Sequence, residues 1–255
     1  MEYSELEEKA KSVRKRIFNF KTKSGYGHLA SCLSCVDIAS SLYYDDKTAF
    51  NHSEDVLIFS KAHGSPSVYP ILADFGYYSD DELEKYCTPE GILRLHSDGT
   101  IPGCHFVGGS LGNGVGFAAG LAHGSGKNVY VILGDAELYE GSVWETLMFV
   151  AHHRINMTLI VDRNAMGILG KTEELLKLEP LHKKFESFGF ETHTIDGHDF
   201  ESLRRVFKNV SSNPRVIIAD TIKGKGVSYM EDVWQYHTII PKSDEDIEQG
   251  MEELS

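Results

Sequence analysis

The chain has 255 residues and a formal net charge of −13, and this acidic balance argues against nucleic acid as a partner. No apolar run is long enough to cross a bilayer, which excludes a membrane-spanning protein. The charged, amphipathic N-terminal residues do not resemble a signal peptide, and four cysteines suit a reducing compartment, so we expect a cytoplasmic protein.

Strand and helix patterns alternate along the chain. Short apolar runs rich in β-branched residues indicate strands, and amphipathic segments with a helical period separate them. This alternation predicts an α/β fold, namely a doubly wound, mostly parallel sheet with helices on both faces. In chain order we expect a helix over 4–20, a helix over 34–44, a strand at 56–59, a helix over 66–75, a helix capped at 80–82, a Gly- and His-rich loop over 88–113, a helix over 112–123, a strand at 129–133, a helix from about 140 to 153, a strand at 158–162, a helix over 174–188, a strand at 191–195, a helix over 200–208 and a strand at 215–220.

The C-terminal segment differs in composition from the rest of the chain. Residues 243–255 are polar and acidic. Such a segment buries too little apolar surface to stay ordered on its own, so it predicts a solvated tail. The sequence therefore predicts one domain over residues 1–242, followed by an acidic C-terminal tail over 243–255.

Cys32 and Cys35 have the C-x-x-C spacing that some metal and redox sites use. They lie in a predicted helix among Leu, Val and Ile, and no second pair follows. Buried free thiols are therefore the better interpretation.

Polar side chains follow two of the predicted strands. Gly134-Asp135-Ala136 closes the strand at 129–133, and Asn164 follows the strand at 158–162. The carboxyl ends of parallel strands form the edge where open α/β sheets bind ligands. An Asp carboxylate and an Asn carbonyl are oxygen ligands suited to Mg²⁺ or Ca²⁺. The pattern predicts a cation that holds a diphosphate against the amino end of the helix beginning near Glu140. An ordinary βα turn with a capping Asp is the alternative.

This pattern resembles the cofactor motif of thiamine-diphosphate enzymes, which is Gly-Asp-Gly followed further along by an Asn. The run from Gly134 to Glu173 is similar to the transketolase version of that motif. Other motifs follow in the order of the transketolase family, from about residue 5 to about residue 240. They are the block around His28, Ser60-Lys61-Ala62-His63 with Tyr69, His96, Pro102-Gly103, the run from Gly108 to Gly114, and Lys223 to Val227 with Trp234 and His237.

The resemblance implies thiamine diphosphate as the cofactor and Mg²⁺ as its metal, with Ca²⁺ or Mn²⁺ as substitutes. It assigns the metal to the side chains of Asp135 and Asn164 and to the backbone carbonyl of Met166. It also places Gly134 and Ala136 against the cofactor. Ala136 stands where the family has Gly, and an Ala fits there unless the position requires a positive φ.

Four histidines fall on family positions, where imidazoles can hydrogen-bond substrate hydroxyls or move protons. The four are His28, His63, His96 and His237. The resemblance places His28 and His96 at the substrate, His63 against the cofactor, and His237 at both. It also places Gly109 and Leu111 against the cofactor.

Glu140 matches a family acid that lies at a subunit interface and links two distant cofactors, so we include it among the catalytic candidates. A first-turn acid stabilised by the helix dipole is the alternative.

A full transketolase is much longer than this chain and contains further domains, one of which binds the aminopyrimidine ring. The resemblance therefore implies the N-terminal, diphosphate-binding subunit of a split transketolase. Such an enzyme transfers a two-carbon ketol unit from a ketose or its phosphate to an aldose or its phosphate. It would need a separate C-terminal subunit, in an α2β2 assembly.

Two alternatives stay open. The chain could be a subunit of another thiamine-diphosphate enzyme, either deoxyxylulose-phosphate-synthase-like or 2-oxo acid dehydrogenase-like. It could also be a non-catalytic regulatory half. The sequence does not indicate which sugars react.

Overall fold

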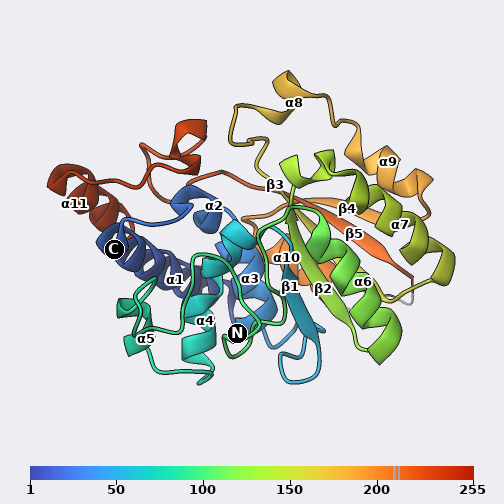
Figure 1. Cartoon of the computed structure of the whole chain (residues 1–255), viewed down its shortest axis with the longest axis horizontal. Coiled ribbons are helices and arrows are strands. Elements are labelled where there is room, and N and C mark those ends of the chain that lie inside the picture. The colour runs from blue at the N-terminus through green and yellow to red at the C-terminus, as the bar shows by residue number, and fades with distance from the viewer. Residues whose placement is uncertain (209–210, 212) are drawn as a thin grey trace.

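The computed structural model describes residues 1–208, 211 and 213–255, and its centre is a five-stranded sheet flanked by helices (Figure 1). The strand order is β1-β2-β3-β5-β4, and every neighbouring pair is parallel. The strands are β1 (Val56–Phe59), β2 (Val129–Gly134), β3 (Met157–Arg163), β4 (Glu191–Asp196) and β5 (Arg215–Asp220). All five lie where the sequence predicts them, which confirms the predicted fold class.

Helices cover both faces of the sheet (Figure 1). One face carries α1 (Tyr3–Ser24), α3 (Val36–Tyr44) and α10 (Phe200–Phe207). The other carries α6 (Asn113–Ser125), α7 (Gly141–His153) and α9 (Leu181–Ser187). The shorter helices are α2 (Leu29–Leu33), α4 (Tyr69–Asp74), α5 (Asp81–Glu84), α8 (Thr172–Leu175) and α11 (Asp244–Glu253), and the 3₁₀ segments are η1 (Ala62–Ser67), η2 (Ala136–Tyr139) and η3 (Trp234–His237).

The two faces have separate hydrophobic cores because side chains alternate along a strand. In β2, Tyr130 and Ile132 pack under α1, α3 and α10, whereas Val131 and Leu133 pack under α6 and α7. Burial on both faces explains why β2 and β3 read as continuous apolar runs. It also leaves their carboxyl ends as the positions where polar side chains emerge.

One predicted helix is interrupted. The helix expected over 174–188 is two helices, α8 and α9, and Pro180 is the residue before α9. Proline has no backbone N–H and disfavours helical backbone at the preceding residue, which explains the break. The helix expected over 66–75 likewise begins as the 3₁₀ segment η1 before α4.

The acidic C-terminal segment is a helix rather than the solvated tail expected from its composition. Ser243 caps α11 by accepting from the backbone N–H of Asp246, and three acidic residues in the first turn complement the helix dipole. Gly250 packs so closely on Phe18 of α1 that a Cβ there would lie 2.4 Å from the ring. Leu254 is also buried. Tertiary contacts with α1 thus order this segment (Figure 1), and its separation from a domain over 1–242 stays a prediction.

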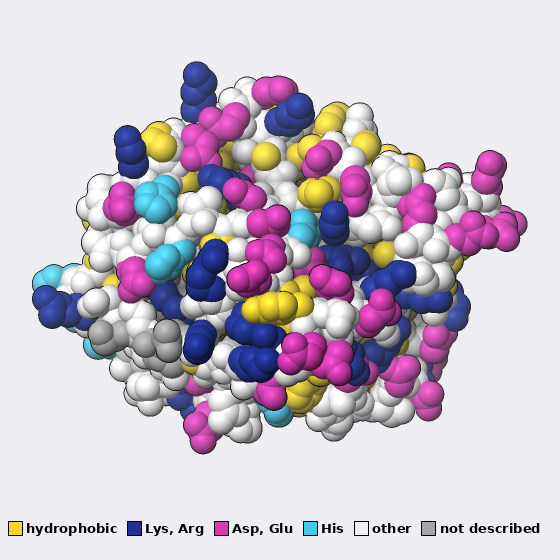
Figure 2. All heavy atoms as spheres, turned by 180° about the vertical axis from the view of Figure 1, so that it is seen from behind, with side chains coloured by type: hydrophobic (Ala, Val, Ile, Leu, Met, Phe, Trp, Pro, Cys, Tyr) yellow, Lys and Arg dark blue, Asp and Glu magenta, His cyan; other side chains and the backbone are white. Residues whose placement is uncertain are grey.

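The surface is highly charged. On the face opposite to the view of Figure 1, acidic and basic side chains are interspersed (Figure 2). Within the described part of the chain, none of the helices has both the length and the apolar character that crossing a membrane requires. Cys32 and Cys35 are buried free thiols, as predicted.

Candidate active site

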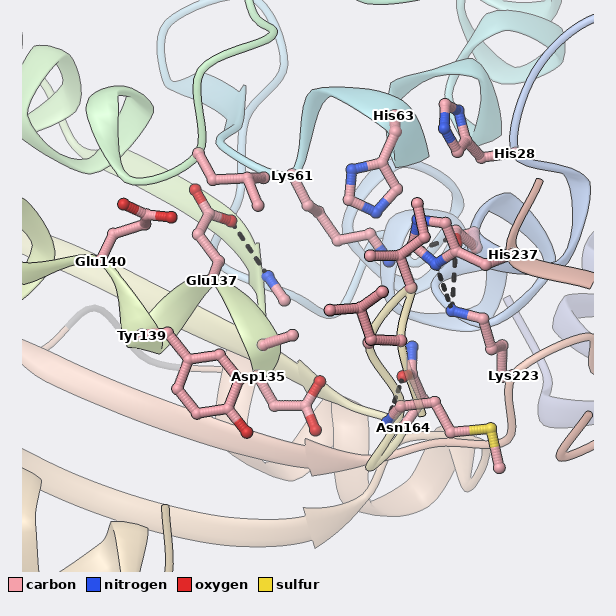
Figure 3. A pocket seen from close by; sticks show the side chains of 18 of the residues that line it. His28, Lys61, His63, Asp135, Glu137, Tyr139, Glu140, Asn164, Lys223 and His237 are labelled. Atoms are coloured by element: carbon pink, nitrogen blue, oxygen red, sulfur yellow. Dashed lines mark hydrogen bonds between the residues drawn. The ribbon is translucent and has the colours of Figure 1, made fainter. Parts of the chain in front are cut away.

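A cavity of about 390 Å³ lies at the carboxyl edge of the sheet (Figure 3). This size is within the usual range for small-ligand sites. The cavity is lined by every residue that the sequence analysis placed in the site: His28, His63, His96, Gly109, Leu111, Gly134, Asp135, Ala136, Glu140, Asn164, Met166 and His237. The structure therefore brings together residues more than two hundred positions apart, while their individual roles stay predictions.

The expected metal ligands emerge side by side from β2 and β3. Gly134 is in register with Asp162, so Asp135 and Asn164 follow directly from neighbouring strand ends. Asn164 Oδ1 accepts the backbone N–H of Met166 at 3.2 Å, which shapes the loop beyond β3. Ala165, between them, has a φ of 57°, a left-handed conformation that costs roughly 1–2 kcal/mol for a residue with a Cβ. This strained residue sets the positions of the Asn164 side chain and the Met166 carbonyl.

Asp135 is a buried carboxylate that forms no ion pair with the described side chains. Its only side-chain hydrogen bond among the described residues comes from Thr172 Oγ1, at 3.3 Å. Burial, with the negative charge of Asp162 nearby, raises the pKa of Asp135 to about 7. A divalent ion would relieve this cost.

The donor set also fits such an ion. Among the described residues, no hydrogen bond to the Met166 carbonyl is found, so its oxygen is available. Where side chains are described, no cluster of three or more His, Cys, Asp or Glu could hold a metal. The donors at the expected site are one carboxylate, one amide and one carbonyl, all hard oxygen donors.

Ala136 fits its position without strain. It begins the 3₁₀ segment η2 and is not among the residues of positive φ. The Gly of the family motif is therefore not required here for its backbone conformation. The replacement of that Gly by Ala leaves the turn after β2 intact.

Four imidazoles form one cluster. Figure 3 shows three of them, His28, His63 and His237, above Asn164. The ring centre of His28 lies 5.2 Å from that of His63, 5.3 Å from that of His237 and 6.0 Å from that of His96. The His28 Nδ1 atom is buried and has no hydrogen-bond partner within the described chain. A polar ligand in the cavity would supply one.

These imidazoles are neutral at neutral pH. Burial, with positive Lys21 nearby, lowers the pKa of His28 to about 4. Burial, with positive Lys223 nearby, lowers the pKa of His237 to about 3. The pKa values of His63 and His96 are also lowered, mainly by burial. A neutral imidazole has one hydrogen-bond donor and one acceptor nitrogen, so these rings can bind hydroxyl groups in either direction.

A buried ion pair lies beneath the histidines, and the sequence analysis missed it. Lys61 and Asp162 pair directly, with side chains 2% and 0% exposed. Burial alone would lower the pKa of Lys61, but Asp162 more than offsets this and raises it. Lys61 comes just after β1 and Asp162 lies near the end of β3. A charged residue at the end of a buried strand was the signal that could have revealed both.

Lys223 is the second cation of the cavity, and the sequence analysis noted only its loop. Its ammonium donates to Ser31 Oγ at 3.2 Å and lies 3.0 Å from His237 Nδ1. Burial, with Lys61 nearby, lowers the pKa of Lys223 to about 8. Lys223 is thus a cation at neutral pH whose charge is sensitive to its surroundings.

Glu137 holds the glycine-rich loop against the cavity. Its carboxylate accepts the hydroxyl of Ser60 and the backbone N–H groups of Gly112, at 2.7 Å, and Gly134, at 3.2 Å. Gly112 has a φ of +82°, and a Cβ there would lie 2.5 Å from Ser142 Oγ. Gly112 is therefore needed because the backbone there approaches the protein itself closely.

Glu140 lies at the rim of the cavity, where it begins α7. It is exposed, and its side chain makes no capping hydrogen bond to the described residues. Its expected role at a subunit interface stays a prediction.

Two sequence models of known families match the chain. The one described as "Transketolase, thiamine diphosphate binding domain" matches residues 124–254, and the one described as "1-deoxy-D-xylulose-5-phosphate synthase" matches residues 1–178.

Several relatives match over nearly their full length. An apulose-4-phosphate transketolase subunit from Actinobacillus succinogenes is 38% identical, with 100% of this chain and 97% of the relative covered. The 6-deoxy-6-sulfo-D-fructose transketolase subunit of a Clostridium species is 33% identical, with 89% and 88% covered. These matches favour a transketolase over the other thiamine-diphosphate enzymes.

Solved structures agree. The transketolase of Campylobacter jejuni superposes with a TM-score of 0.90 at 28% identity, and the match covers 100% of this chain but 43% of that enzyme. The chain therefore spans less than half of a full-length transketolase. Family models, relatives and fold together show that this chain belongs to the transketolase family and contains its thiamine-diphosphate-binding domain.

Proposed function

We propose that this chain is the diphosphate-binding subunit of a two-chain transketolase that moves a two-carbon ketol unit from a ketose phosphate to an aldose phosphate. The observation that carries the proposal is the cavity in which the Asp135 and Asn164 strand ends face four neutral histidines. Breaking a C–C bond beside a carbonyl needs an electron sink, which the thiazolium of bound thiamine diphosphate supplies. This chain holds the diphosphate and surrounds the reacting atoms.

The charges of the cavity explain why a metal ion is needed. Asp162 neutralises Lys61, and the negative charge of Asp135 offsets that of Lys223 without forming an ion pair with it, so positive charge is not in surplus. A diphosphate would therefore enter a site with little net attraction. A divalent cation on Asp135, Asn164 and the Met166 carbonyl provides that attraction.

The neutral histidines suit the sugar. A neutral imidazole can donate to one hydroxyl and accept from another, and burial keeps these rings neutral over the physiological range. We assign His28 and His96 to the substrate hydroxyls. We assign His63 to the cofactor and His237 to both, since it lies beside Lys223.

Apolar side chains rim the cavity and support a separate partner chain. Ile168, Leu169 and Leu175 line the mouth, Leu169 is 75% exposed, and the adjacent Leu176 is 64% exposed. The loop that carries α8 stands out from the body of the molecule (Figure 1). A group of exposed leucines beside a functional cavity is typical of an interaction surface. We assign it to the partner chain that encloses the cofactor.

A second apolar surface supports pairing of two copies of this chain. The helices α6 and α7 pack together on one face of the sheet. They expose three apolar side chains, namely Phe117 of α6 and Met148 and Phe149 of α7. We propose that this face meets the same face of a second copy, as in a two-fold dimer. With one partner chain on each copy, the proposed assembly is α2β2, and we assign Glu140, just before α7, to this interface.

The relatives suggest the substrate class. The most similar of those above acts, by its name, on apulose 4-phosphate, and the Clostridium protein on a sulfonated fructose. Both sugars carry an anionic group away from the ketone. We propose a ketose of this kind as the donor, and apulose 4-phosphate is the first to test.

The test combines the purified chain with its partner chain, Mg²⁺ and thiamine diphosphate. We expect ketol transfer from apulose 4-phosphate or xylulose 5-phosphate by the two-chain assembly, and no turnover by this chain alone. Turnover by the isolated chain would contradict the two-chain proposal. Cofactor uptake without turnover on any ketose would identify a non-catalytic half, and pyruvate as the preferred donor would point to a synthase.

Cofactor affinity is expected to fall in alkaline solution because of Lys223. In the free protein its pKa is about 8, so its charge is lost as pH rises through 8. A bound diphosphate favours the charged form and raises the pKa of Lys223, so affinity should drop by up to about tenfold per pH unit above 8. Titration calorimetry of the assembly between pH 7 and 9.5 checks this, with Lys223→Arg as the control that should remove the slope. A wild-type affinity that stays constant over this range would exclude Lys223 from the anion site.

A further inference from the structure

His198 lies outside the cavity, but it is hydrogen-bonded to the backbone of Ile222, the residue before Lys223. It sits in the loop between β4 and α10, with its side chain 12% exposed. His198 Nδ1 lies 2.6 Å from Asp37 Oδ2, and its Nε2 accepts the backbone N–H of Ile222 at 2.8 Å. The imidazole thus bridges α3 to the residue immediately before Lys223.

The two hydrogen bonds fix the tautomer of His198. Because Nε2 accepts an N–H, it carries no proton, and the proton of the neutral ring must be on Nδ1. Nδ1–H then donates to the Asp37 carboxylate. The ring is held at both nitrogens, so it has one orientation and one tautomer.

Asp37 is itself firmly anchored. Arg14 of α1 donates to both of its oxygens, and both side chains are buried. Burial alone would raise the pKa of Asp37, but Arg14 and His198 more than offset this and lower it. A bidentate Arg–carboxylate pair has a defined geometry. Asp37 therefore holds His198 in a fixed position relative to α1 and α3.

At its other end, the bridge supplies a hydrogen-bond acceptor for a backbone N–H that the sheet leaves unpaired. The strand β5 ends at Asp220, and Thr221 N–H still reaches the Arg163 carbonyl of β3 at 3.1 Å. Beyond this point none of the described strands provides an acceptor for the N–H of Ile222. A half-buried N–H without a partner is costly. His198 satisfies it and so determines where the chain turns away from the sheet.

Lys223 is the next residue after this turn. Its Cα position follows from that of Ile222, and its ammonium meets Ser31 Oγ and His237 Nδ1 in the cavity. On the far side, the Gly224 N–H donates to the Ala30 carbonyl at 3.0 Å. Lys223 is thus held between two backbone hydrogen bonds, and the one before it depends on a side chain.

We propose that His198, oriented by Asp37, is a positioning residue that sets the Lys223 ammonium against the cofactor diphosphate. The inference rests on the proposed function, since it takes the cavity as the diphosphate site. It predicts that His198 acts on cofactor binding only through Lys223. A merely structural histidine would instead affect stability without this dependence.

The experiment is a double-mutant cycle in the assembly of the full chain with its partner, with Mg²⁺ and thiamine diphosphate as ligands. The variants are His198→Ala, Lys223→Met and the double variant, with Kd from calorimetry. His198→Gln is the conservative variant, since its amide oxygen can accept from Ile222 while its NH₂ group donates to Asp37. His193→Ala is the matched control, because His193 is a nearby exposed histidine whose ring hydrogen-bonds to Glu191 and not to the Lys223 loop.

We expect His198→Ala to raise Kd roughly five- to tenfold, the range of one lost buried hydrogen bond. His198→Gln should stay within about twofold of wild type, and His193→Ala should have no effect. In the Lys223→Met background, His198→Ala should add nothing, because residues that act as one unit are not additive. Amide hydrogen exchange at Ile222 should accelerate at least about tenfold in His198→Ala and not in His193→Ala.

Two results would overturn the inference alone, namely an unchanged Kd in His198→Ala, or a full additional loss in the Lys223→Met background. Both leave wild-type cofactor binding intact, so the proposed function would stand. A wild-type assembly without Mg²⁺-dependent uptake would instead refute the proposed function. The Ile222 exchange rate and the ¹⁵N shifts of the His198 ring, measured on the chain without cofactor, test the bridge in either case. A proton on Nε2 would contradict the bridge, because a protonated Nε2 cannot accept the N–H of Ile222.

Discussion

Replacing Asp135 by Asn is expected to abolish Mg²⁺-dependent uptake of thiamine diphosphate, with a loss of affinity above about 100-fold. Removal of an outer partner of a metal ligand already costs about 10- to 100-fold, and Asp135 is the only charged ligand expected here. The Asn keeps the shape of the side chain but removes the negative charge. Calorimetry with and without Mg²⁺ in the two-chain assembly measures the loss.

The same variant should be more stable than the wild-type chain in the absence of metal. In the folded chain the pKa of Asp135 is about 7, against an ordinary value of 3.8, so the folded state binds the extra proton between these pH values. Wild-type stability should therefore fall as pH rises from 4 to 7, by on the order of 2–4 kcal/mol in total. Asp135→Asn lacks this contribution. Denaturant unfolding of metal-free protein at pH 4 and 7 checks the sign.

Asp220→Asn is the control for both effects. Asp220 ends β5 at the same edge of the sheet, but it is exposed and pairs with Arg163 outside the cavity. It should leave cofactor affinity unchanged and stability within about 1 kcal/mol. Retention of Mg²⁺-dependent uptake by Asp135→Asn would refute the assigned metal site. Lower metal-free stability of that variant at pH 7 would contradict the electrostatic explanation.

Replacing Lys61 by Met is expected to lower the free energy of unfolding by about 3–5 kcal/mol. The substitution leaves the Asp162 carboxylate buried without its cation, and removal of one partner of a buried pair has a cost in this range. Ser34 and Thr221 hydroxyls still donate to Asp162, but they do not replace the charge. Urea unfolding at pH 7 measures the effect.

The double variant Lys61→Met/Asp162→Asn keeps this prediction testable even where the single variant does not fold. It removes both charges, so it should recover at least half of the lost stability. Lys23→Met is the surface control, because its pair with Glu84 is exposed on both sides and should contribute less than about 1 kcal/mol. A loss below about 1 kcal/mol in Lys61→Met would show that the buried pair does not stabilise the fold.

The positions of Asp135 and Asn164 could be predicted because they follow from local patterns. Each comes after an apolar run that only a buried strand explains, and parallel strands end at one edge. The four motif histidines were found through resemblance to a family, and the structure places them around one cavity. The prediction that the acidic C-terminal segment is a solvated tail was wrong, because composition does not reveal that Gly250 allows close packing on Phe18.

The sequence by itself determined the strands and their polar ends, because burial and backbone period leave a local record along the chain, whereas the histidines of the cavity came from resemblance to a family. The tertiary structure alone decided the pairing of Lys61 with Asp162, the place of Lys223 beside His237, and the bridge from His198 to Ile222. These contacts join positions 14 to 101 residues apart. They depend on the strand order, in which β5 lies between β3 and β4, and on loops whose path no local pattern records. The strand order and the loop paths decide which charged side chains lie close together, because electrostatic attraction depends on distance in space and not on separation in the sequence.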